Sequence, residues 1–149
     1  VYDKISNRIK ITKALSVNNG TQVYTVIPSE TKSIFYDVVF WFQSEKRITN
    51  DTPIKVYSNS PSFGYNFVFI FYRENSLLFP EKYPRDFLSI PPRVRNPYGL
   101  YAFDKHVYAS LKFLYKYDLN DLVVKTQTVD EPEVTTFDDK KSERSSAGS

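Results

Sequence analysis

Short runs in which hydrophobic and polar residues alternate fill the first third of the chain, and this pattern is typical of β-strands. Isoleucine alternates with lysine and threonine over residues 9–13, and a second alternating run covers residues 22–27. Asn18-Asn19-Gly20 lies between them, and these residue types tolerate the backbone of a tight turn. The two runs therefore predict a β-hairpin.

Two further runs predict the strongest strands. Residues 34–42 place apolar or aromatic residues at every even position, and residues 63–72 read Phe-Gly-Tyr-Asn-Phe-Val-Phe-Ile-Phe-Tyr. The second run is too short for a membrane span, which needs about 20 residues. Its aromatic and β-branched content favours a strand, and because both faces are apolar we expect it to be the central strand of a sheet covered on both sides.

Short strands are also predicted at residues 54–57, 77–79 and 122–124. Turns recur about every ten residues between these runs, as they do in antiparallel sandwiches and barrels. The predicted fold is mainly β (α+β): an antiparallel β-sandwich or partly closed barrel of about six to seven strands, with one C-terminal helix packed on it.

The predicted helix covers residues 104–118. Asp104 is a good N-cap, and the helical spacing of Val107, Leu111 and Leu114 forms an apolar stripe. We expect Tyr108 and Tyr115 to lie beside this stripe. The lysines at positions 105, 112 and 116 are expected on the opposite side.

Residues 80–97 contain five of the nine prolines, together with basic and aromatic residues. Because proline removes a backbone donor and fixes φ, this stretch predicts an extended arm, interrupted at most by one short turn of helix at residues 85–89. Arg93 and Arg95 would project to the same side of an extended backbone. The predicted contact residues of the arm are Lys82, Arg85, Arg93, Arg95, Tyr98 and Tyr101.

Charge divides the chain into two parts. Residues 1–129 carry 17 Lys and Arg against 11 Asp and Glu, whereas residues 130–149 carry 3 against 6. We interpret residues 1–125 as a single β-rich domain and residues 126–149 as a polar, acidic C-terminal tail. A basic body suits contact with nucleic acid or with an acidic protein surface.

Catalytic signals are weak. The four glycines form no phosphate-binding loop, cysteine is absent, and one histidine, His106, excludes a histidine-rich metal cluster. A serine hydrolase would need His106 with Ser58, Ser60 or Ser62 and with Asp37 or Asp104, but no nucleophile elbow surrounds these serines. His106 is better explained as a packing or capping residue. The sequence predicts no enzyme, no cofactor and no metal site.

These observations favour a non-enzymatic structural or assembly protein, with the arm and the tail contacting other protein subunits in a homo- or hetero-oligomer. The abundant Tyr, Phe, Asn, Lys and Ile have AT-rich codons, which suggests a phage virion component located in the virion or the bacterial host cytoplasm. The alternative is a nucleic-acid-binding module that uses the basic, aromatic arm around Arg93 and Arg95. No contact with a membrane is expected.

Overall fold

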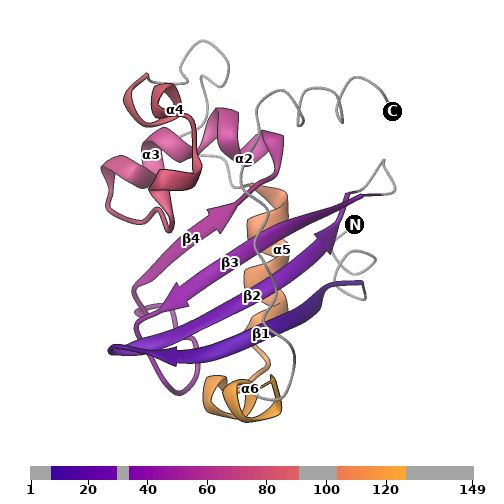
Figure 1. Ribbon diagram of the computed structural model, residues 1–149. Coiled ribbons are helices and arrows are strands. Elements are labelled where there is room, and N and C mark those ends of the chain that lie inside the picture. The colour runs from indigo at the N-terminus through magenta and orange to yellow at the C-terminus, as the bar shows by residue number, and fades with distance from the viewer. Residues whose placement is uncertain (1–7, 30–33, 91–103, 127–149) are drawn as a thin grey trace.

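The computed structural model describes residues 8–29, 34–90 and 104–126, and the fold is built from these residues. The strands are β1 (Lys10–Val17), β2 (Gly20–Pro28), β3 (Phe35–Phe42) and β4 (Ile54–Ser58). They form one open antiparallel sheet in the order β1-β2-β3-β4, with several short helices around it (Figure 1). The α+β class is confirmed, but the sandwich or barrel of six to seven strands is wrong for the described residues.

The predicted hairpin is confirmed as β1 and β2. Their register runs from Lys10 opposite Val26 to Val17 opposite Gly20, and Asn18 and Asn19 make the turn. Asn19 has a φ of 62°, a left-handed conformation that asparagine tolerates better than most residues. A register shift between residues 11 and 13 introduces a bulge into β1, a common feature of edge strands.

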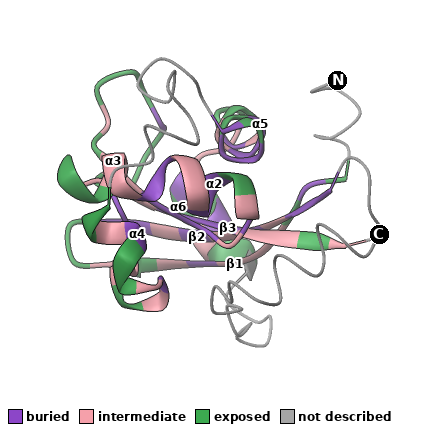
Figure 2. Ribbon diagram, turned by 90° about the horizontal axis from the view of Figure 1, so that it is seen from above, coloured by how far each residue is buried: buried purple, intermediate pink, exposed green. Residues whose placement is uncertain are grey.

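One face of the sheet packs against α5 (Lys105–Leu114) and α6 (Leu119–Thr126). The even positions of β3 point toward these helices, because Tyr36 contacts the ring of His106 on α5. Figure 1 shows α5 behind the strands and α6 below them, and Figure 2 shows the same two layers from above. The core between the layers includes Phe40, Phe42 and Leu114, all fully buried.

The predicted central strand at residues 63–72 is wrong. The segment forms two short helices, α2 (Pro61–Asn66) and α3 (Val68–Arg73). Ser60 caps α2 by accepting a hydrogen bond from the Phe63 N–H at 3.3 Å, and Pro61 occupies the first turn. The rings of Phe67 and Phe71 pack against the Phe63 ring, with centroids 6.3 and 5.2 Å away. These phenylalanines therefore lie together on one face of the two helices.

The extended arm is also wrong where the structure describes it. Residues 80–90 form a 3₁₀ turn, η1 (Pro80–Lys82), and then α4 (Arg85–Ser89), which matches the short turn expected there. Tyr83 and Phe87 are buried. The tyrosine hydroxyl joins the backbone of Ser58, donating to its carbonyl at 2.7 Å and accepting from its N–H at 3.0 Å. This half of the predicted arm is therefore folded onto β4.

The two remaining short strands that the sequence predicts are not formed. Leu77 makes only an isolated parallel bridge to Val56, and the predicted strand at 122–124 lies within helix α6. Residues 91–97 of the arm and the predicted tail, residues 127–149, lie outside the described residues. None of the helices in the described ranges has the length and apolarity needed to cross a membrane.

Candidate functional site

Helix α5 presents the most distinctive exposed surface of the described chain. It begins as predicted, because the Asp104 carboxylate accepts hydrogen bonds from the backbone N–H groups of His106 and Val107, both at 3.0 Å. His106, Val107 and Leu114 are buried against the sheet, and the opposite side of the helix faces outward. This outward side defines the α5 outer face: Lys105, Tyr108, Lys112, Tyr115 and Lys116, all exposed.

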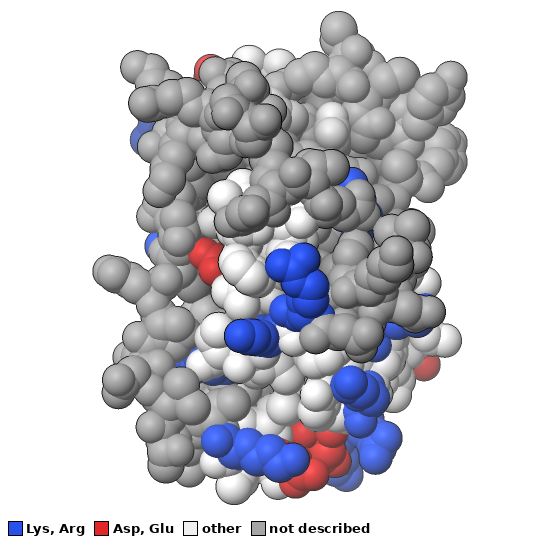
Figure 3. All heavy atoms as spheres, turned by 90° about the vertical axis from the view of Figure 1, so that its right-hand side faces the viewer, with Lys and Arg blue, Asp and Glu red and all other residues white. Residues whose placement is uncertain are grey.

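The α5 outer face combines positive charge with aromatic area. Lys105 and Tyr115 lie about 15 Å apart along the helix axis, at 1.5 Å per residue. No acidic residue occurs between positions 105 and 116. Tyr108 and Tyr115 are each 40% exposed, which contradicts their predicted place beside the apolar stripe. In Figure 3, which shows one side of the molecule, the charged part of the described surface is mostly Lys and Arg.

Aromatic contacts hold the last lysine of this face. The Lys116 ammonium lies 4.4 Å from the centre of the Phe113 ring and 5.3 Å from that of Tyr117. Both rings are half-buried, so the lysine stem lies on a fixed base. An ammonium so placed is attracted to the negative faces of the rings, and the Lys116 side chain stays exposed. The face suits an acidic partner surface.

Two of the predicted arm residues can be placed. Lys82 is half-buried in η1, with its ammonium 5.9 Å from the centre of the Phe79 ring, and Arg85 is exposed at the start of α4. Neither joins the α5 outer face. Arg93, Arg95, Tyr98 and Tyr101 lie outside the described residues, so the arm as a contact surface stays a prediction.

Three residues considered for a hydrolase meet at the start of α5. The Ser62 hydroxyl lies near the Asp104 carboxylate and lowers its pKa slightly, and His106 Nδ1 lies 3.9 Å from Asp104 Oδ1, beyond hydrogen-bond distance. Ser58 and Ser60 are buried, and Ser60 caps α2. Because Asp104 Oδ1 accepts hydrogen bonds from the backbone N–H groups of His106 and Val107, the group resembles a helix cap rather than an activated nucleophile with its base.

Asp104 is a buried carboxylate at this junction. Burial raises its pKa above the ordinary 3.8, although the backbone N–H of Val107, the His106 ring and the Ser62 hydroxyl each oppose that rise. Asp104 therefore caps α5 from a buried position, through hydrogen bonds to the first turn of that helix. The packing role predicted for His106 agrees with its burial and with its ring contact to Tyr36, whose centroid lies 5.1 Å away.

A polar hollow of about 1000 Å³ lies at the loop between β3 and β4. The start of α6 borders it through Asp118 and Asn120, and the Leu119 N–H between them donates to the Lys46 carbonyl at 2.8 Å. Its walls carry charges of both signs, from Glu45, Lys46 and Arg47 among others, so it favours no single class of charged ligand. Within the described ranges, no three His, Cys, Asp or Glu residues are grouped to hold a metal ion.

Comparisons with known proteins identify no relative of this chain. No protein-family model matches the sequence, and the searches of curated proteins and of solved structures likewise give no match. The case for function rests on the residues of this chain.

Proposed function

We propose that this chain is a non-enzymatic assembly protein, a virion component of a phage or a subunit of a comparable large complex. It binds neighbouring subunits through the α5 outer face and through its acidic C-terminal residues. The observation that carries the proposal is the exposure of Tyr108 and Tyr115 among three lysines on a helix whose other side is fully used in the core.

Tyrosine at an exposed position supports a protein partner. Tyrosine is enriched in interfaces because it contributes a large, rigid contact area and one polar group at low entropic cost. Lysine is depleted in interface centres, so the three lysines are better suited to the rim, where they would select an acidic partner and speed its association. Residues 130–149 have the matching charge, with six acidic residues against three basic ones.

Light scattering on the purified protein tests the proposal. We expect the full chain to associate as its concentration rises, and both a chain ending at Lys125 and the double variant Lys112→Glu/Lys116→Glu to associate less. Lys46→Glu is the matched control, because Lys46 is equally exposed but lies on the β3–β4 loop. Circular dichroism confirms that each variant is folded. A full chain that is monomeric at all concentrations and salt levels contradicts the proposal.

A further inference from the structure

The second face of the sheet, opposite α5, carries cations and aromatic rings on neighbouring strands. Along β1, β2 and β3, Lys13 pairs with Tyr24 and Tyr24 with Val39, while Trp41 pairs with Gln22 on one side and with Lys55 of β4 on the other. Residues on adjacent strands that pair in this way point to the same side of a sheet. No described helix lies across β1 and β2 on this side (Figure 1).

We infer that this surface binds single-stranded nucleic acid. We define the sheet face by five residues: Lys10, Lys13, Tyr24, Trp41 and Lys55. Tyr24 and Trp41 would stack on bases, and the three lysines would contact phosphates. The inference is independent of the proposed assembly role, because α5 lies on the other side of the sheet.

The two aromatic residues are placed by the register at a backbone spacing that suits neighbouring bases. Trp41 is the diagonal neighbour of Tyr24 across β2 and β3, a relation that places Cα atoms about 7–8 Å apart. A Cβ on Gly20 would lie 3.2 Å from the Trp41 indole nitrogen, so the indole extends along β2 over a residue without a side chain. The Tyr24 hydroxyl donates to the Gln22 side chain at 3.0 Å, which fixes the ring.

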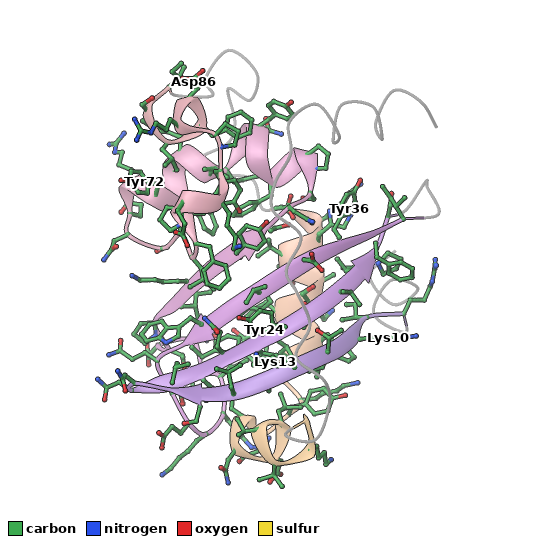
Figure 4. The ribbon with its side chains drawn as sticks, viewed as in Figure 1. Lys10, Lys13, Tyr24, Tyr36, Tyr72 and Asp86 are labelled. Atoms are coloured by element: carbon green, nitrogen blue, oxygen red, sulfur yellow. The ribbon has the colours of Figure 1, made fainter. Side chains whose placement is uncertain are left out.

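Charge on the sheet face favours a polyanion. Lys10 is exposed, and the Lys13 ammonium lies 5.4 Å from the centre of the Tyr24 ring (Figure 4). The four strands contain one acidic residue, Asp37, and its carboxylate accepts a hydrogen bond from the Asn59 amide at 3.4 Å. Cations interleaved with aromatic rings on an antiparallel sheet are the arrangement that binds unpaired bases without strong sequence preference.

Trp41 makes the inference directly testable, because it is the single tryptophan of the chain. Unlabelled oligo(dT) of 20 nucleotides is titrated into the full chain at low salt, and tryptophan emission is followed. A base stacked on Trp41 is expected to quench that emission. Anisotropy of the same oligonucleotide carrying a fluorescent label gives the affinity and its dependence on salt.

Variants separate stacking from charge. Tyr24→Leu should weaken binding about 5- to 150-fold and leave the salt dependence unchanged, as expected for loss of one stacked base. Lys10→Gln/Lys13→Gln should reduce the slope of log K against log salt by about 1.4, since each phosphate contact on a single strand contributes about 0.7. Lys112→Gln/Lys116→Gln, on the α5 outer face, is the matched control and should change neither quantity.

Several results would overturn the inference. They are an absence of binding at 50 mM salt, binding without quenching of Trp41, and a larger loss from the α5 control than from the sheet-face variants. A polyglutamate peptide that binds and quenches as strongly as the oligonucleotide would also overturn it, since the surface would then accept any acidic chain. Because the lysine variants change only exposed or half-buried side chains, they remain informative even where Tyr24→Leu unfolds the protein.

Discussion

Tyr83→Phe tests whether residues 80–90 are a folded part of the domain or an arm. The Tyr83 hydroxyl satisfies two groups of one residue, the N–H and the carbonyl of Ser58, at 3.0 and 2.7 Å. Ser58 and the tyrosine are both buried, so water cannot replace the lost hydroxyl without opening the contact. The phenylalanine variant keeps the ring contact with Tyr57, whose centroid lies 5.3 Å away, and removes only the oxygen.

The expected loss follows from the two groups left without a partner. A buried donor or acceptor that loses its hydrogen bond costs about 1–3 kcal/mol, so for the two groups we expect the free energy of unfolding to fall by roughly 2–6 kcal/mol. Urea unfolding followed by circular dichroism measures this change directly. Tyr72→Phe is the control, because Tyr72 is 47% exposed, and its effect should lie within about 0.5 kcal/mol of zero.

Alkaline pH gives an independent readout of the same hydroxyl. Burial raises the pKa of Tyr83 well above the ordinary 10.0. The folded state therefore favours the protonated form, and its contribution to stability is complete below pH 10 and is lost as the pH rises toward the folded-state pKa. The wild type should lose more stability than Tyr83→Phe above pH 10. Equal unfolding energies for Tyr83→Phe and Tyr72→Phe would show that residues 80–90 do not pack on β4.

Two further substitutions test the cap of α5 and the pairing of β2 with β3. Asp104→Asn keeps an acceptor for the N-cap but has no charge. Because burial raises the pKa of Asp104, the folded wild type takes up its proton at a higher pH than the unfolded chain does. The free energy of unfolding of the wild type should therefore rise relative to that of the variant as the pH falls from 7 to below the ordinary 3.8. Urea unfolding across that range checks it, and a difference that does not vary with pH would refute it. Gly20→Ala places a Cβ 2.2 Å from the Phe42 carbonyl oxygen, so β2 and β3 must separate locally. We expect a loss of about 1–3 kcal/mol in thermal or urea unfolding, and an unchanged stability would contradict this strand pairing.

The strands were predictable where one face of a segment is buried and the other is not. Residues 22–27 show that alternation and form β2. Residues 34–42 form β3, in which the even positions make one apolar face, although Val39 on the other face is also fully buried, and residues 54–57 form β4. The continuous apolar run at 63–72 has no such contrast, and a run of that kind does not distinguish a strand from a buried helix. The local signal was Ser60 followed by Pro61, an N-cap and a first-turn proline.

The same reasoning explains the last element. Residues 122–124 are apolar and two of them are β-branched valines, but Asp118 precedes them as a cap, and its carboxylate accepts a hydrogen bond from the Asn120 N–H at 3.0 Å. Leu119 and Leu122 are then three positions apart on one buried face of α6. The cap at Asp118 and the packing of the two leucines therefore outweigh the strand propensity of this segment. Neither is visible in a short hydrophobic run taken alone.

The candidate site was partly readable from the sequence of α5. Its start and its exposed lysines follow from periodicity, but the predicted helix over residues 104–118 is too long, because α5 ends at Leu114, and Tyr108 and Tyr115 lie on the exposed side instead of beside the apolar stripe. Position 108 lies three residues from Lys105, and position 115 lies three residues from Lys112, so helical spacing places each tyrosine beside a lysine. Their aromatic character suggested burial, but a ring with a polar end is also stable at an exposed position.

Folding of residues 80–90 onto β4 removes the buried residues of this stretch from any contact surface. Tyr83 and Phe87 are buried in the core, and the side chains that stay exposed include Arg85 and Ile90. The α5 outer face and the sheet face each present several lysines, and the sheet separates the two faces. One domain could therefore bind a neighbouring subunit on one side and a nucleic acid on the other, and variants of each face should affect one activity without the other.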